Sequence, residues 1–216
     1  TYFRQLRPFF RDLTARDGLP DAYQGLKPPT LPSIIPKARS ADECRHILLT
    51  AEQYPWDTSY ERWRAVGIIG VMLYAGLRKG EVLRLRFLDV DLSQDTIRIN
   101  RGKGRHGGKD RVVMVAPELR RILENYLRER RRCGFTGPGF FASMRTGQPI
   151  SDTTLKRIVE AIKRASGIRF SIHSLRHSFV TMLLRSGVPI HVARDLAGHA
   201  SITTTAGYLR VFDEDK

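Results

Sequence analysis

The chain has little cysteine, no long apolar run and a shortage of acidic residues. Its 216 residues include two cysteines, Cys44 and Cys133, whose surroundings match no metal-binding or disulfide pattern. This argues against a disulfide-stapled scaffold and favours a reducing, intracellular setting. No stretch is apolar over a length that spans a bilayer, and the N-terminal residues carry no secretory signal. We therefore expect a cytoplasmic protein with no membrane partner.

Positive charge is present in excess. The chain contains 37 lysine and arginine residues against 22 aspartate and glutamate residues, which gives a net charge of +15. A protein that meets a polyanion is expected to carry such a charge. Nucleic acid is the first candidate, and an anionic membrane is the second, although no basic amphipathic anchor supports it. Hydrophobic residues make up 41% of the chain, which is enough for a core and excludes wholesale disorder.

Proline divides the chain into parts. Apolar residues recur at helical spacing near the start, so residues 1–26 are predicted to be one amphipathic helix and its exit. An extended linker is predicted over residues 27–36, because four prolines there cannot continue a helix: Pro28, Pro29, Pro32 and Pro36. We expect the main domain to occupy residues 37–216, and the first helix to be the end of a truncated upstream domain.

Capping signals and apolar periodicity predict a mainly helical main domain. Ser40-Ala-Asp-Glu43 is a capping box that opens a helix over 41–53. A deeply buried helix is predicted from Thr58 to Tyr74, with Gly76 as its C-cap, followed by a short helix over Lys79–Leu85. Further helices are expected over 117–132, 151–165, 174–186, 188–197 and 201–209.

Three short segments rich in β-branched residues predict a small sheet, over 89–91, 95–100 and 111–115. A basic, glycine-rich loop, Arg101-Gly-Lys-Gly-Arg-His-Gly-Gly-Lys-Asp110, lies between the last two and predicts a hairpin. Helices around one small three-stranded antiparallel sheet make an α+β domain.

The chain also holds residues with the chemistry that metal-free cleavage of a phosphodiester requires. Charge on the nonbridging oxygens must be neutralised, and guanidinium groups do this with a permanent charge and planar donors. A nucleophile must lose a proton, and the leaving oxygen must gain one. Arg78 lies just past a helix end with Glu81 three residues on, and His173 and Arg176 lie on one helical face.

Five blocks of such residues occur in order along the chain. They are Gly76-Leu-Arg78 with Glu81, Gly102-Lys-Gly104, His173-Ser-Leu-Arg176-His177, Leu196-Ala-Gly-His199, and Tyr208, nine residues after His199. This ordered set resembles the tyrosine recombinase (phage integrase) family over roughly residues 37–210. The resemblance implies that residues 37–216 form the catalytic domain and that the first helix ends a core-binding domain.

The resemblance implies how the central step proceeds. Arg78 and Arg176 would clamp the scissile phosphate. Tyr208 would attack that phosphate, giving a 3′-phosphotyrosyl link and a free 5′-hydroxyl. A phenol is mostly protonated at neutral pH, so a nearby base or cationic cluster is required. The covalent link would allow rejoining without ATP or metal, so no cofactor is expected.

Proton transfer and DNA contact are assigned by the same resemblance. Lys103 would protonate the leaving 5′-oxygen, with Lys109 as the alternative, because this hairpin loop is longer than the family's usual one. His173 would assist proton transfer at the tyrosine, and His199 would hydrogen-bond the phosphate. Cations of the hairpin are expected to contact DNA: Arg101, Arg105, Lys109 and Arg111.

The implied protein is a site-specific recombinase that integrates, excises or transposes a mobile element. Its expected partners are a double-stranded DNA recombination site and further copies of the chain, in a tetrameric synapse. The resemblance places it in a bacterial cytoplasm, associated with the nucleoid when bound to DNA.

Two other functions stay open. A type IB topoisomerase shares the tyrosine and the basic residues, and relaxation of supercoils without a specific site would favour it. A DNA-binding regulator that does not cut is less consistent, because phosphate contacts alone do not need a tyrosine and two histidines placed in this way.

Several residues have plainer interpretations. His173 and His177 are four residues apart, but no further ligand pattern accompanies them, so zinc is disfavoured and His177 is expected to be structural. Glu81 is expected to support Arg78 rather than to act as a base. Tyr74 and Tyr126 are predicted to pack in the core, and Arg128–Arg132 to form a solvated helix face.

Overall fold

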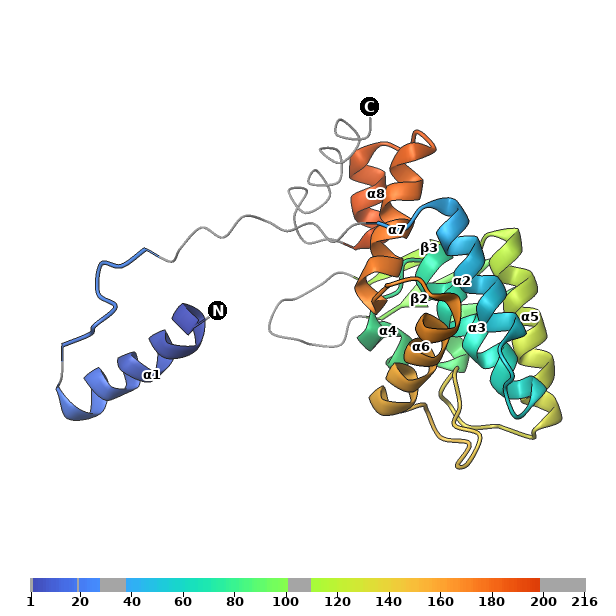
Figure 1. The fold of residues 1–216 in the computed structure, drawn as a ribbon, viewed down its shortest axis with the longest axis horizontal. Helices are drawn as coiled ribbons and strands as arrows, with labels where there is room; N and C mark the ends of the chain where they lie inside the picture. Colours follow the sequence, from blue (N-terminus) through green and yellow to red (C-terminus); the bar gives the residue numbers. More distant parts are fainter. Residues whose placement is uncertain (1, 19, 28–37, 101–109, 199–216) are drawn as a thin grey trace. The chain divides into compact units, whose positions relative to one another are not determined.

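The computed structural model describes residues 2–18, 20–27, 38–100 and 110–198 (Figure 1). The chain divides into two compact units, Thr1–Ile34 and Ile35–Lys216. Within the described residues, no helix combines the length and apolarity needed to cross a bilayer.

The first unit contains one helix, α1 (Tyr2–Asp17), as the apolar spacing predicted. The helix ends at Gly18, which adopts a φ of 64°. Phe10 packs against Tyr23 with ring centroids 5.4 Å apart, while Phe9 remains 56% exposed. The assignment of this unit to a core-binding domain stays a prediction, and most of the expected linker lies outside the described residues.

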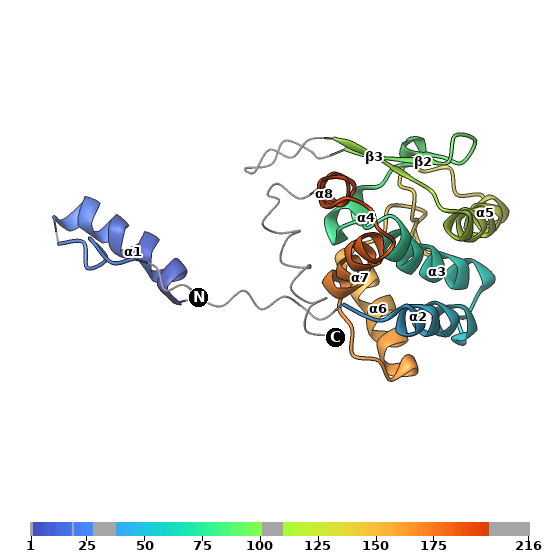
Figure 2. The ribbon, with the colours of Figure 1, turned by 90° about the horizontal axis from the view of Figure 1, so that it is seen from above.

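The second unit is built around helix α3 (Ser59–Tyr74). It contacts α2 (Ala41–Gln53), α5 (Pro117–Arg132) and α7 (Ile172–Arg185). Figure 2 shows α3 between two layers, with α5 and the sheet on one side and α2 and α6 (Asp152–Ser166) on the other. The predicted α+β class is confirmed.

Helix α3 can occupy the centre because its sequence offers no polar face to solvent over most of its length. Every residue from Arg64 to Leu73 is buried. Gly70 lets α5 approach closely, since a Cβ there would lie 3.1 Å from Leu119 Cδ1. The side chain of Thr58 caps the first turn, accepting from the Glu61 N–H at 3.1 Å. This helix is therefore specified by local capping and by burial together.

The C-terminal end of α3 differs slightly from the prediction. Ala75, not Gly76, is the C-cap, and Gly76 follows with a φ of 61°. The Leu77 N–H then donates back to the Val71 carbonyl at 3.1 Å. The cap lies one residue earlier than predicted, because the left-handed glycine occupies the position that follows the cap. The turn leads directly into α4 (Lys79–Arg84).

The sheet has the predicted three antiparallel strands, β1 (Val90–Asp91), β2 (Thr96–Ile99) and β3 (Arg111–Met114), in the order β1-β2-β3. Asp89 instead ends a 3-10 turn, η1 (Phe87–Asp89), where its carboxylate accepts from Arg86. Asp95 adopts a φ of 51°, so it belongs to the turn and not to the strand. The first two strand predictions start one residue too early because these aspartates form local turns. The predictions that ended at residues 100 and 115 each extend one residue past the observed strand.

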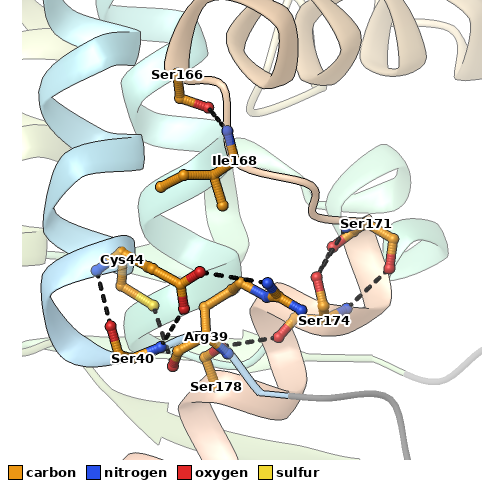
Figure 3. Close-up of polar contacts among 9 residues, drawn as sticks. Arg39, Ser40, Cys44, Ser166, Ile168, Ser171, Ser174 and Ser178 are labelled. Atoms are coloured by element: carbon orange, nitrogen blue, oxygen red, sulfur yellow. Dashed lines mark hydrogen bonds and ion pairs between the residues drawn. The ribbon is translucent and has the colours of Figure 1, made fainter.

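Helix α7 starts earlier than predicted, at Ile172, because Ser171 caps it by accepting from the Ser174 N–H at 3.1 Å. Figure 3 shows that the Arg39 N–H donates to Ser178 Oγ, a bond of 2.8 Å that ties the start of the second unit to α7. Helix α8 (Ile190–Ala197) follows. The helix expected over 201–209 lies outside the described residues.

The basic run at the end of α5 is not wholly a solvated face. Arg130 is buried, and its guanidinium donates to the carbonyls of Phe135, Gly137 and Gly139. It also lies over the Phe87 ring, 5.2 Å from the centroid. The prediction was wrong at this residue, because the loop after α5 turns back and needs donors for its carbonyls. Tyr126 is fully buried and Tyr74 is half-buried, as expected for core tyrosines.

Candidate functional site

Arg78 lies at the start of α4, immediately after the turn at Gly76. Its guanidinium donates to Glu81 Oε1 at 3.1 Å and to the Gly198 carbonyl at 2.7 Å. Its own N–H donates to Glu81 Oε2 at 2.8 Å. The side chain is 35% exposed, so it is partly accessible to an incoming anion. Glu81 supports Arg78 in this structure, as its spacing predicted.

Arg111 provides the second cation on Glu81. Its two terminal nitrogens donate to the two carboxylate oxygens, each at 2.9 Å, in a bidentate pair. Burial by itself would raise the pKa of Glu81. The hydrogen bonds and positive charges of Arg111, followed by those of Arg78, lower the pKa to about 2 instead. Glu81 therefore stays ionised throughout the physiological range and is a very weak base, which fits a supporting role.

Arg176 comes from a distant part of the chain but reaches the same region. It lies on α7, is 5% exposed, and donates to the carbonyls of Gly76 and Ala197. Because Gly76 precedes Arg78 by two residues, Arg176 fixes the turn that places the other arginine. The ordered blocks containing Arg78 and Arg176 are therefore adjacent in space, as the motif order led us to expect.

Three guanidinium groups converge on the end of α8. Arg111 Nε donates to the Leu196 carbonyl at 3.0 Å, Arg176 to the Ala197 carbonyl, and Arg78 to the Gly198 carbonyl. The last carbonyls of a helix lack intrahelical partners and carry the negative end of its dipole. Gly198 adopts a φ of 61°, which ends the helix. The last turn of α8 is thus held by side chains from β3, α7 and the start of α4.

The two histidines of the third block, His173 and His177 on α7, have different surroundings. His173 is exposed in the first turn of the helix, where it is available to a substrate. His177 is half-buried, and burial, with smaller contributions from His173 and Arg176, lowers its pKa to about 4. His177 is therefore neutral at pH 7, consistent with a structural role.

The structure brings together Arg78, Glu81, Arg111 and Arg176, with His173 on the same helix as Arg176. The remaining expected site residues lie outside the described residues, and their roles stay predictions: Arg101, Lys103, Arg105, Lys109, His199 and Tyr208. Arg111 was expected to contact DNA, but its side chain is 7% exposed and paired with Glu81. The structure gives no support to that expectation.

The sequence did contain a signal for the placement of Arg111. Side chains of a strand alternate between its two faces. Val113 and Val115 are buried, whereas Val112 and Met114 are exposed. Arg111 has the parity of the buried pair, so alternation would have placed it toward the interior, where a carboxylate partner is required.

No group of three or more histidine, cysteine, aspartate or glutamate side chains suited to a metal ion lies within the described ranges. The expectation that the reaction needs no metal stays a prediction.

The domain is helical with a small sheet, and arginines of separate motifs surround the end of α8. Such a cluster of guanidinium groups is suited to binding a phosphate group. The chain belongs to the phage integrase family, whose model matches residues 39–215. This confirms the family that the five ordered blocks indicated.

Curated relatives support this membership. The tyrosine recombinase XerA of Pyrococcus furiosus is 32% identical over 198 residues, which cover 90% of this chain and 64% of the relative. The putative integrase/recombinase y4eF of Sinorhizobium fredii is 33% identical over 208 residues, covering 95% of this chain and 76% of the relative. The chain thus spans somewhat less than two thirds of the length of the archaeal relative.

Solved structures share the fold. A crystal structure of XerA recombinase aligns with a TM-score of 0.71 and 26% identity, covering 98% of this chain and 82% of that one. XerH recombinase bound to its difH substrate after cleavage aligns with a TM-score of 0.69 and 26% identity, covering 83% of this chain and 51% of that one. Lambda integrase, at 20% identity and a TM-score of 0.66, shares the fold.

Proposed function

We propose that this chain is the catalytic part of a site-specific recombinase that cuts and rejoins double-stranded DNA through a 3′-phosphotyrosyl intermediate. The observation that carries the proposal is the convergence of Arg78 and Arg176 beside the end of α8. The family and the relatives named tyrosine recombinases support it.

The proposed reaction conserves the phosphodiester. The phenolic oxygen of Tyr208 attacks phosphorus, the bond to the 5′-oxygen breaks, and the phosphate remains attached to the tyrosine. His173 assists removal of the phenolic proton, and Lys103 supplies a proton to the 5′-oxygen. Attack by a free 5′-hydroxyl then reverses these steps and rejoins a strand.

The arginine network suits the charge that develops in this reaction. Arg78 and Arg176 keep their charge at every physiological pH. The carboxylate of Glu81 is matched by Arg111 as well as by Arg78, so the three residues together carry one net positive charge. Preorganised cations of this kind stabilise the additional negative charge of the transition state more strongly than the ground state.

The finer assignments belong to the same proposal. The target is a specific double-stranded site, and recombination takes place in a tetramer of this chain on DNA, in the bacterial cytoplasm. The biological task is the integration, excision or transposition of a mobile element, a role supported by the relative named as an integrase/recombinase.

The test is a covalent trap. Nicked duplex fragments of the source genome are incubated with the protein, and the reaction is stopped with detergent. DNA that is covalently linked to the protein is then isolated, and its sequence at the junction is determined. We expect adducts at a defined sequence, lost in Tyr208→Phe. Arg78→Ala should slow adduct formation by about 100-fold or more while changing the Kd for DNA much less.

Tyr74→Phe is the matched control, because it removes a half-buried hydroxyl elsewhere in the domain, and it should form adducts like the wild type. An adduct that persists in Tyr208→Phe would show that the nucleophile is another residue. Relaxation of supercoiled plasmid with no sequence preference would point instead to a type IB topoisomerase.

A further inference from the structure

Arg111 uses its whole guanidinium inside the protein. Nη1 and Nη2 donate to the two oxygens of Glu81 at 2.9 Å each, and Nε donates to the Leu196 carbonyl at 3.0 Å. The side chain is 7% exposed. Arg176 donates to neutral carbonyls, whereas Arg111 would have to break a bidentate ion pair with a buried carboxylate before it could bind a DNA phosphate. We therefore expect Arg111 to act on the reaction indirectly.

We propose that Arg111 is a positioning residue for the cleavage step: it holds the Glu81 carboxylate and the last turn of α8 so that Arg78 faces the scissile phosphate. The inference rests on the proposed recombinase function, but it concerns a residue that neither attacks the phosphate nor binds it.

Electrostatics gives the first reason. Glu81 is 5% exposed on its side chain, and each of its oxygens accepts from both Arg78 and Arg111. With Arg78 as the only partner, the carboxylate would neutralise the cation that is needed for the phosphate. The guanidinium of Arg111 balances the negative charge of Glu81. The remaining positive charge is therefore available at Arg78, which is the more exposed of the two arginines.

Geometry gives the second reason. Arg78 and Arg111 donate to carbonyls two residues apart at the end of α8, Gly198 and Leu196. The same two arginines share one carboxylate, so the start of α4, the start of β3 and the end of α8 form one hydrogen-bonded unit. Loss of Arg111 would remove one of the two arginines that hold the carboxylate and one of the three that hold the turn.

The experiment compares Arg111→Met and Arg111→Lys with the wild type by single-turnover cleavage and by DNA affinity. For Arg111→Met we expect cleavage to fall by about 10–100-fold, the range for residues that support a catalytic group, while the Kd for DNA changes less than about threefold. Arg111→Lys should recover part of the rate, because it restores charge but not the bidentate fork.

Arg130→Met is the matched control. Arg130 is a buried arginine whose guanidinium also donates to backbone carbonyls, but at the loop after α5. It should lower the Tm and leave the cleavage rate of the folded protein unchanged. Glu81→Gln combined with Arg111→Met should be less impaired than the product of the single losses, because both act on one interaction.

Three results would overturn the inference. A loss in DNA affinity equal to the loss in cleavage, with a shallower salt dependence, would make Arg111 a phosphate contact. A wild-type cleavage rate in Arg111→Met, or fully multiplicative losses with Glu81→Gln, would also remove the positioning role. The Tyr208→Phe protein distinguishes failure of this inference from failure of the proposed function. If the wild type forms adducts and Tyr208→Phe abolishes them, the proposed function stands, and any of these three results contradicts only the role of Arg111.

Discussion

His177 shows how neighbouring residues set the charge of a side chain near the site. Burial disfavours its cationic form, and smaller electrostatic contributions from His173 and Arg176 act in the same direction, giving a pKa of about 4. The imidazole therefore adds no charge beside Arg176 at neutral pH. In an unfolded chain the same histidine would titrate near 6.5, so folding and protonation are linked.

This linkage predicts a dependence of stability on pH. As the pH falls from about 7 to about 4, the unfolded state binds a proton at His177 before the folded state does, so the free energy of unfolding falls by about 1–3 kcal/mol. Urea unfolding of wild type and His177→Gln across this range measures the effect. The difference between the two proteins should shrink toward low pH.

His46→Gln removes an exposed histidine on α2 and should keep the wild-type pH profile. A His177→Gln protein whose stability changes with pH in parallel with the wild type would contradict the assigned pKa.

At the scale of elements, the turn between α3 and α4 connects the core to the site. Gly76 has a φ of 61°, and a Cβ there would lie 2.3 Å from Cδ1 of the Phe179 ring on α7. Its carbonyl accepts from Arg176, and Arg78 follows two residues later. The conformation of the turn, its packing against α7 and the positions of Arg78 and Arg176 therefore all depend on Gly76.

Gly76→Ala should be strongly destabilising. The left-handed conformation costs about 1 kcal/mol for alanine, and the clash with an aromatic ring adds about 1–3 kcal/mol. Denaturant unfolding measures the total, and cleavage should fall together with it because Arg176 loses the geometry of its acceptor.

Gly187→Ala separates the two contributions. Gly187 has a φ of 82° but nothing within 4 Å of the position of a Cβ, so the substitution should cost only the conformational part, about 1 kcal/mol. Equal losses in the two variants would mean that the ring of Phe179 moves aside at no cost.

On the scale of the whole molecule, stability resides in the second unit. All the buried hydrophobic residues among those described lie at or beyond Cys44, and none of residues 6–18 and 20–27 is buried. The core of the second unit joins α2, α3, α5, α6, the sheet and the start of α7 in one cluster. A unit of this composition has its own core and is expected to fold by itself.

Removing residues 1–34 should therefore leave thermal unfolding nearly unchanged, with a Tm within about 2 °C of that of the longer chain. Calorimetry of the chain with and without this segment measures the difference, and circular dichroism confirms that the helices remain. A decrease of more than about 4 °C would show that the first unit stabilises the second, contrary to this expectation.

Much of the fold was predictable because its signals are local. The capping box of Ser40 and Glu43 and the caps at Thr58 and Ser151 are bonds between residues three apart, so they can be recognised directly in the sequence. The errors at Asp89 and Asp95 arose where an aspartate could end a strand as readily as continue it. The motif order led to the family and to Arg78, Glu81, His173 and Arg176 as candidates.

What the sequence by itself determined is the family, a set of candidate site residues, and where most helices begin and end. The tertiary structure decided how those residues are used: Arg111 pairs with Glu81 instead of lying free for DNA, Arg130 caps a loop, and Arg78 and Arg176 meet at α8. The bonds from Arg111 and Arg78 to the end of α8 join residues 85 and 120 positions apart. No local preference encodes such contacts, because they exist only once the core has brought distant segments together and a buried charge must find its partner.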